Sequence, residues 1–320
     1  MLKYIKKISN KKNNKVVFYL KNIALLCAPS LFFRVRLKAE LERLKAYDHN
    51  YIKSRVDYYN QINDSFDVSS KSVNLDEFKS VKKKTYFFDL YKYVSFFDRE
   101  NRFDFIFGDV IHVPKTPSFV KSRPVSDNAN SILMKLNEVR HFLFISDKLD
   151  FVDKKPSVVW RGGAYRDKRR FFVKRLHKCA NFDIGQTNKP VEDVAWQKPF
   201  LSIEEQLQYK FIFCIEGNDV ATNLKWVMSS NSIAVMPKPQ YETWFMEGSL
   251  KAGVHYIEVK DDFSDAEEKI DYYSNHIDEA NTIIKHANDY VEQFKDLKRE
   301  KLISLLVLSK YYIQSDQSAK

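Results

Sequence analysis

The stretch that most constrains the fold is residues 208–235, in which two apolar runs flank a polar turn. Phe211 to Ile215 is an unbroken apolar run, which is typical of a short strand buried on both faces. Residues 220–228 suit a helix, and residues 232–236 suit the next strand. The stretch therefore predicts a strand–helix–strand unit with two parallel strands.

In such a unit, ligands bind beyond the carboxyl ends of the strands, often with a phosphate at the N-terminus of the helix. The turn Glu216-Gly217-Asn218-Asp219 contains a glycine, which can take backbone angles that other residues resist. Thr222, Asn223 and Lys225 fall in the expected first helical turn, where they would offer donors to a diphosphate. The same pattern also suits an ordinary unit in which Asn218 or Asp219 only caps the helix.

A second strand-to-helix turn carries the sequence Trp160-Arg161-Gly162-Gly163, ahead of a basic helix expected from Lys168 to Lys178. An arginine beside a glycine pair in this position suits an anion site. It equally suits a tight turn with a solvated arginine. Further strands are expected at 141–145, 157–160 and 255–259.

A third turn follows the apolar stretch from Phe103 to Phe107 and contains Gly108 and Asp109. A long irregular stretch comes next, and loops of this kind in compact domains are often functional. A helix is expected from Asn128 through Arg140, and residues 264–314 are expected to be helical with Ser264 as an N-cap. Tyr86 to Phe97 is compatible with a strand or a helix.

The length of 320 residues suggests two domains, with a boundary expected near Pro156. The three cysteines, Cys27, Cys179 and Cys214, are scattered. Their spacing argues against a disulfide framework and a zinc site, and favours a reducing compartment.

Positive charge is concentrated at the N-terminus, where residues 1–45 hold twelve Lys and Arg against Glu40 and Glu42. The apolar segment from Val16 to Phe33 is interrupted by polar residues and a proline, so it predicts neither a spanning helix nor a signal peptide. It could lie on an anionic membrane surface or pack as an ordinary helix. Nucleic acid is a third partner, but the charge is not spread over a folded face as a groove-binding protein needs.

Several catalytic motifs are absent from the sequence: Asp-x-Asp, the Walker A loop, GxGxxG, GxSxG and HExxH. The seven histidines show no metal spacing. What remains is two turns that carry cations and donors, and the turn carboxylate Asp109. This inventory suits transfer of a group from a diphosphate donor without a protein-bound metal.

Taken together, these residues resemble glycosyltransferase family 90, and within it the bacterial lipopolysaccharide core enzymes, which are related to protein O-glucosyltransferases. The similarity spans roughly residues 85–290. The matching segments are Phe103 to Asp109, Lys121-Ser122-Arg123-Pro124, Asn128 to Ser131, Arg140-His141-Phe142, Trp160-Arg161-Gly162, Tyr209-Lys210-Phe211, Glu216-Gly217-Asn218, Ala221 to Trp226 and His255-Tyr256.

The resemblance implies an α/β fold of the GT-B type, with two Rossmann-like domains that face a central cleft. Residues 46–154 would form the acceptor-side domain and 155–290 the nucleotide-sugar domain. Residues 1–45 would add a basic helical extension and 291–320 a C-terminal helix.

It also implies an inverting transfer that needs no metal or other cofactor, with Asp109 as the general base. A turn carboxylate that only caps nearby amides is the alternative role for Asp109. The residues expected to bind the donor are Arg161, Gly162, Gly163, Glu216, Gly217, Asn218, Thr222, Asn223, Lys225 and Glu242.

The chain departs from the eukaryotic branch in two places. It has Asn223 where that branch has an arginine, so we expect Lys225 or Arg161 to supply the charge. It has Gly-Asp-Val-Ile where that branch has Arg-Asp-Tyr-Pro around the base.

The resulting expectation is transfer of a hexose, glucose or galactose, from a UDP-sugar to an inner-core sugar of lipopolysaccharide. The enzyme would be cytoplasmic and peripheral on the inner face of the cytoplasmic membrane, held there by its N-terminus, with no nucleic-acid partner. The alternatives are a capsule or other surface glycan as the acceptor, or a non-catalytic protein that binds membranes or nucleic acid.

Overall fold

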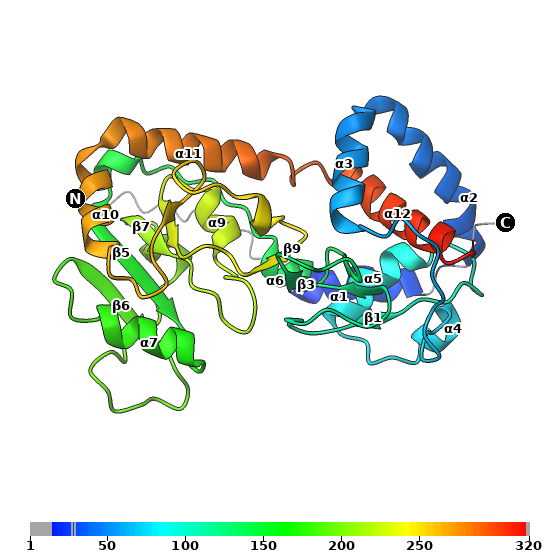
Figure 1. The fold of residues 1–320 in the computed structure, drawn as a ribbon, viewed down its shortest axis with the longest axis horizontal. Coiled ribbons are helices and arrows are strands. Elements are labelled where there is room, and N and C mark those ends of the chain that lie inside the picture. Colours follow the sequence, from blue (N-terminus) through cyan, green and yellow to red (C-terminus); the bar gives the residue numbers. More distant parts are fainter. Residues whose placement is uncertain (1–14, 27, 29, 318–320) are drawn as a thin grey trace.

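Two parallel sheets stand in opposite halves of the molecule, with helices packed around each (Figure 1). The computed structural model describes residues 15–26, 28 and 30–317. Five of the twelve basic residues in 1–45, namely Lys3, Lys6, Lys7, Lys11 and Lys12, lie outside the described residues. The α/β class predicted from the sequence is confirmed by the parallel pairing in both sheets.

The larger sheet has five parallel strands in the order β10-β8-β7-β5-β6. The strands are β5 (Lys155–Gly162), β6 (Phe182–Gln186), β7 (Tyr209–Phe213), β8 (Ile233–Met236) and β10 (Ile257–Glu258). The helical elements in this part of the chain are η2 (Phe151–Asp153), α7 (Asp167–Leu176), α8 (Ile203–Gln206), α9 (Leu224–Met228), η3 (Glu247–Ser249), α10 (Ala266–Asn275) and α11 (Ile277–Glu292). The apolar runs that predicted β7 and β8 are buried on both faces, as central parallel strands require.

The smaller sheet has three parallel strands in the order β1-β2-β4. The strands are β1 (Phe105–Ile106), β2 (Ser118–Val120) and β4 (Ser131–Leu133). The helices of this half are α1 (Lys15–Leu26), α2 (Ser30–Leu41), η1 (Glu42–Ala46), α3 (His49–Tyr59), α4 (Leu75–Phe78), α5 (Thr85–Val94), α6 (Glu138–His141) and α12 (Leu297–Gln314). The ambiguous aromatic stretch is thus helix α5, which buries Phe87, Phe88 and Leu90.

The two halves are joined by β-pairing and by the C-terminal helix. Strand β3 (Ser122–Pro124) follows β2 directly and pairs antiparallel with β9 (Tyr241–Thr243), which follows β8. After α11 the chain returns to the smaller half, where α12 packs against α3, α2 and α5 (Figure 1). Pro156, expected near a domain boundary, lies inside β5.

Four expectations about secondary structure were wrong. The helix expected from Asn128 through Arg140 is formed only at its end, in α6. Its first part contains strand β4, because Ser131 to Leu133 are buried in register with β2, and tertiary pairing overrides local propensity. The strand expected at 141–145 is irregular after α6. Helix α9 begins only at Leu224, so the expected first turn is largely outside it. Helix α10 begins at Ala266 with Asp265, and not Ser264, as its N-cap residue.

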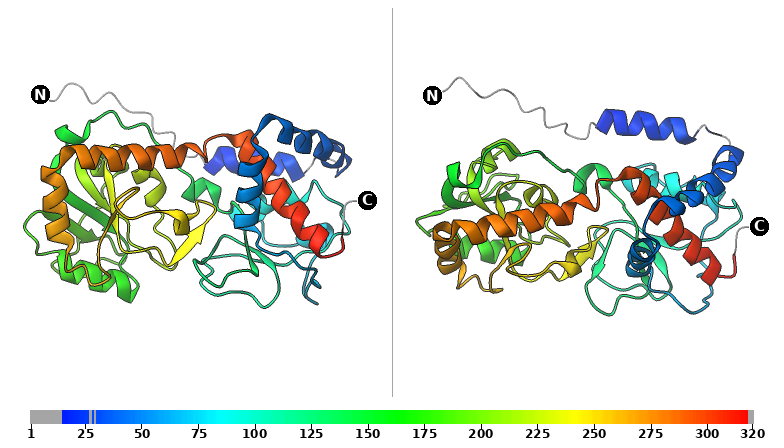
Figure 2. Two further views of the ribbon diagram at one scale, coloured as in Figure 1. Left: turned by 45° about the horizontal axis from the view of Figure 1, so that its top comes forward. Right: turned by 90° about the horizontal axis from the view of Figure 1, so that it is seen from above.

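The N-terminal helices lie at one side of the molecule, and α1 runs along its outer surface (Figure 2). Phe18 and Tyr19 of α1 pack edge-on against Phe88 of α5. Among the described residues, no single helix is long and apolar enough to cross a membrane. One pair of consecutive helices over residues 17–46, bent by 108°, meets the length and composition criteria together.

Candidate active site

The strand order of the larger sheet reverses between β5 and β7. After β5 the chain moves to β6 on one side, and it then returns to β7 on the other side of β5. The loops that leave such neighbouring strands diverge, which opens a crevice beyond their carboxyl ends. Gly163 follows β5, residues 217–219 follow β7, and both groups line a cavity at this position.

Two adjoining cavities, of about 670 and 260 Å³, occupy this crevice. Both are lined by Asp109, Arg166, Gly217 and Asn218. The smaller cavity is also lined by Arg140, His141, Arg169 and Thr222. The structure thus brings the proposed base together with five of the ten residues expected to bind the donor: Gly163, Glu216, Gly217, Asn218 and Thr222.

Asp109 reaches the cavity from the turn after β1. Gly108 has a φ of +115°, a conformation that only glycine adopts without strain, so the turn before the carboxylate depends on that glycine. Asp109 Oδ1 lies 2.5 Å from Lys121 Nζ, and Oδ2 accepts a 3.0 Å hydrogen bond from Asn218 Nδ2. The side chain of Asp109 is 26% exposed.

Lys121 connects the two halves of the site. It lies between β2 and β3, and its ammonium also lies 2.5 Å from Asp219 Oδ2, in the turn after β7. Burial opposes ionisation of Asp109, but the hydrogen bond and the charge of Lys121 outweigh it and lower the pKa of this carboxyl below its ordinary value. Burial likewise opposes the charge on Lys121, but the charge of Asp219 and the hydrogen bonds to Asp109 and Asp219 outweigh it and raise its pKa. Asp109 is therefore ionised at neutral pH.

Three arginines surround the same cavity. Arg166 precedes α7 and donates from Nε to Asn218 Oδ1 at 2.6 Å. Arg169 lies on the first turn of α7, and its guanidinium donates to the backbone carbonyls of Gly163, Glu216 and Ile215. Burial and the neighbouring charge of Arg140 lower the pKa of Arg169. These cations form an electropositive wall suited to a phosphorylated ligand.

Position 217 requires a residue without a side chain, because Arg169 passes close to it. A Cβ at this position would lie 3.0 Å from the Arg169 guanidinium. Gly217 does not use the backbone angles that glycine alone takes freely, since among the described glycines only Gly108 and Gly253 have positive φ. Glu216 next to it pairs with Lys168 at 3.0 Å and accepts from the backbone amides of Gln240 and Tyr241.

Two cations that the sequence placed at the diphosphate lie elsewhere. Arg161 pairs with Asp183 of β6 at 2.7 Å and also donates to the Asp183 and Pro199 carbonyls. Lys225 is fully buried and pairs with Glu247, which also binds Thr243. Neither side chain lines the cavities around Asp109.

Three other residues that were expected to bind the donor also do not line these cavities. Glu242 is buried between Arg123, whose Nε lies 2.8 Å away, and the Tyr58 hydroxyl. Asn223 donates to the Phe213 carbonyl at 2.9 Å and so ties the turn to β7. The carbonyl of Gly162 accepts from the Thr187 amide.

Sequence reasoning missed Lys121, Arg140, His141, Arg166 and Arg169 as site residues. A signal existed for Arg166 and Arg169, which occupy the start of the helix after β5, where the chain approaches the crevice. Lys121, Arg140 and His141 lie in segments that match the family, but no local pattern marked them as site residues, because their position depends on how the two sheets face each other. Within the described part of the chain, no group of three or more His, Cys, Asp or Glu side chains could hold a metal ion.

A parallel α/β sheet with a carboxylate and arginines at its switch point is compatible with a Rossmann-like glycosyltransferase. Residues 132–311 match the family described as Glycosyl transferase family 90. The chain is 40% identical over 303 residues to the O-glucosyltransferase LpsA of Dichelobacter nodosus, covering 93% of this chain and 95% of that protein. A 113-residue region is 29% identical to the uncharacterized protein 179R of Invertebrate iridescent virus 6, covering 33% of this chain and 9% of that protein.

The chain therefore belongs to glycosyl transferase family 90. It is a glycosyltransferase, as the sequence motifs predicted.

Proposed function

We propose that the enzyme transfers a hexose from a UDP-sugar to an inner-core sugar of lipopolysaccharide, with inversion and without a metal ion. The observation that carries the proposal is the position of Asp109, an ionised carboxylate in the cavity that Arg140, Arg166 and Arg169 also line. The name of the Dichelobacter nodosus relative, an O-glucosyltransferase LpsA, supports glucose as the sugar and lipopolysaccharide as the acceptor class.

The donor would lie beyond the carboxyl ends of β5 and β7. Its diphosphate would face Arg140, Arg166 and Arg169, and the nucleoside would extend into the larger cavity beside Glu216 and Tyr241. In this arrangement the half with the five-stranded sheet binds the donor and the other half binds the acceptor. That assignment is the GT-B arrangement expected from the sequence.

Asp109 would act as the general base. The acceptor oxygen attacks the anomeric carbon from the face opposite the diphosphate, the bond between that carbon and the phosphate oxygen breaks, and UDP leaves with the electron pair. The proton of the acceptor hydroxyl passes to Oδ2 of Asp109 after the acceptor displaces Asn218 from it. Because Lys121 lowers the pKa of Asp109, the proton would move only as the attacking oxygen becomes acidic during bond formation.

The cations would replace a metal ion at the leaving group. Charge that develops on the β-phosphate as the glycosidic bond breaks can be stabilised by preorganised donors in a site of low dielectric. Arg169 is suited to this role because its guanidinium is fixed by three backbone carbonyls and has no carboxylate among those partners.

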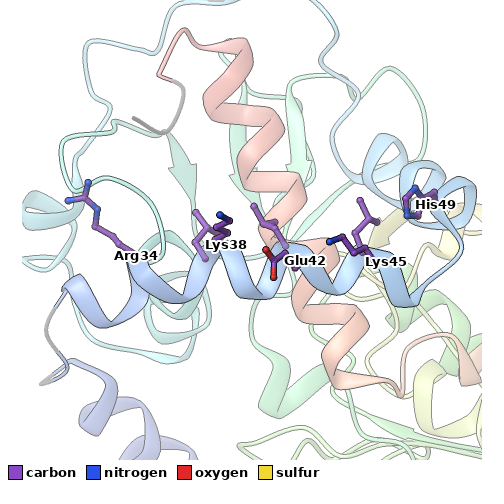
Figure 3. Close-up of a pocket in the computed structure, with 8 residues that line it drawn as sticks. Arg34, Lys38, Glu42, Lys45 and His49 are labelled. Atoms are coloured by element: carbon purple, nitrogen blue, oxygen red, sulfur yellow. The ribbon is translucent and has the colours of Figure 1, made fainter.

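The N-terminal helices would hold the enzyme at the anionic inner face of the cytoplasmic membrane. Leu31, Phe32 and Val35 of α2 are 67%, 47% and 69% exposed. Arg34, Lys38 and Lys45 line a groove along α2 and η1, where Glu42 and His49 also lie (Figure 3). Apolar side chains beside basic ones suit a surface that binds anionic lipid headgroups, which would bring the cavity near a lipid-anchored acceptor.

The test is transfer from a panel of UDP-sugars to lipooligosaccharide acceptors that lack the outer core, in the presence of EDTA. We expect one UDP-hexose to be consumed, UDP to be released, and the product to have the opposite anomeric configuration from the donor. Activity that is lost with EDTA and restored by a divalent cation would contradict the metal-independent mechanism. Failure to bind or turn over any UDP-sugar would contradict the donor assignment.

A further inference from the structure

His141 is a buried imidazole without a hydrogen-bonding partner at the wall of the smaller cavity. It is the last residue of α6 and is only 2% exposed, yet it lines the cavity together with Asp109 and Arg169. Within the part of the chain that the structure describes, neither Nδ1 nor Nε2 forms a hydrogen bond. Buried polar groups are nearly always paired, so an orphaned imidazole at a cavity wall points to a missing ligand group.

The surroundings of His141 keep the ring neutral. Burial and the charges of Lys225, Lys121 and Arg140 lower its pKa well below the ordinary value. A neutral imidazole carries one N–H donor and one acceptor nitrogen. A hydroxyl can pair with either nitrogen, since it accepts from the N–H and donates to the unprotonated nitrogen, whereas a diphosphate oxygen can pair only with the N–H.

The arginines are not needed to bind a hydroxyl, so His141 can do so. Arg140, Arg166 and Arg169 line the same cavity and are the groups suited to the diphosphate. Asp109 marks the side from which the acceptor would attack. His141 therefore lies in the cavity that holds both the base and the arginines, where the transferred sugar must sit.

We infer that His141 is a specificity-determining residue that binds hydroxyl groups of the pyranose ring being transferred. The inference rests on the proposed function, because it assumes that a nucleotide sugar occupies this cavity. It assigns to His141 a role that neither the arginines nor Asp109 has, namely recognition of the sugar itself. A site built to bind a hydroxyl rejects an analogue that lacks it far more strongly than an apolar pocket can.

The test compares UDP with UDP-glucose, and UDP-glucose with its 2-, 3-, 4- and 6-deoxy analogues, in the wild type and in His141→Phe. Phenylalanine fills a similar volume and removes two unpaired buried atoms, so the unliganded variant should unfold at the same or a higher temperature. We expect kcat/KM for UDP-glucose to fall about 10- to 100-fold, with the dissociation constant for UDP unchanged within about twofold. His177→Phe is the matched control, since His177 lies on the far end of α7 against Trp196, and it should retain wild-type values.

The deoxy analogues locate the contact. In the wild type, one of them should lose at least about tenfold in kcat/KM, and in His141→Phe that loss should shrink, because the variant has already lost the same hydrogen bond. Equal weakening of UDP and UDP-glucose, or unchanged discrimination among the analogues, would overturn the inference. If His141→Phe does not fold, His141→Leu provides the same comparison, because leucine also lacks any hydrogen-bonding group. A wild type that binds no UDP-sugar would instead overturn the proposed function, and that result needs no variant.

Discussion

The Lys121 ammonium lies 2.5 Å from the carboxylate of Asp109 and 2.5 Å from that of Asp219. One buried cation thus joins the turn after β1 to the turn after β7, which belong to different sheets. The ion pair with Lys121 keeps Asp109 ionised. Because Lys121 also contacts Asp219, it fixes the position of Asp109 relative to the arginines across the cavity. The site consequently depends on both halves of the molecule at once.

Replacing Asp109 by asparagine should abolish most of the transfer. General-base catalysis contributes about 10²- to 10⁴-fold, so kcat for transfer to the lipooligosaccharide acceptor should fall by that order. UDP binding, measured by calorimetry, should remain because the arginines are untouched. A variant that transfers at the wild-type rate would show that Asp109 is not the base.

Lys121→Met should move the acidic limb of the pH–rate profile. The pKa of Asp109 is lowered in the folded protein, so activity that needs its carboxylate is present above that pKa and is lost as the pH falls through it. Without Lys121, burial raises this pKa, and the limb should shift to higher pH. Lys121→Arg retains the charge and should shift it less. An unchanged limb in Lys121→Met would mean that another group controls the acidic loss of activity.

Arg140→Met should weaken binding of the donor without unfolding the protein. Arg140 is exposed at the cavity, and a hydrogen bond to a charged group is worth about 1.5–3 kcal/mol, so the dissociation constant for UDP should rise about 10- to 100-fold. Arg175→Met changes an exposed arginine of α7 that does not line the cavity, and it should bind UDP as the wild type does. Equal UDP affinity in both variants would show that Arg140 does not bind the diphosphate.

Lys225→Met should destabilise the fold rather than act on the donor. Lys225 pairs with Glu247 in the interior, and removing one partner of a buried ion pair costs about 3–5 kcal/mol. The double variant Lys225→Met/Glu247→Gln should recover part of that stability, as measured by urea unfolding. At low temperature, the folded fraction of Lys225→Met should bind UDP normally. A selective loss of UDP binding without destabilisation would mean that Lys225 binds the diphosphate after all.

Membrane contact should depend on the exposed apolar residues of α2. Leu31→Glu/Phe32→Glu places two negative charges beside the basic groove, so co-sedimentation with vesicles containing phosphatidylglycerol should fall at least about tenfold, given about 1 kcal/mol for each basic residue near an anionic surface. Val152→Glu alters an exposed apolar residue in η2 and should bind vesicles normally. Similar vesicle binding by all three proteins would contradict the N-terminal contact.

Local sequence was sufficient to predict four of the five strands of the larger sheet, all but β6, and the turns that open onto the cavity. The apolar runs of β7 and β8 are long enough to be buried strands, and Gly217 with its neighbours marks the turn between β7 and α9. Asp109 follows its strand as predicted. Where tertiary pairing outweighs local preference, the prediction was wrong, as for β4, which is a strand only because it lies beside β2.

The chain by itself determined that it is an α/β protein with a strand–helix–strand unit, and that Asp109, Gly217 and Asn218 lie in turns at strand ends. Only the tertiary structure decided which charges serve the site. A cation close to a predicted site in sequence, such as Lys225, is paired with Glu247, whereas Lys121 meets Asp109 from a neighbouring strand. The physical reason is that charges buried during folding must find partners, and those partners are chosen by the packing of distant segments.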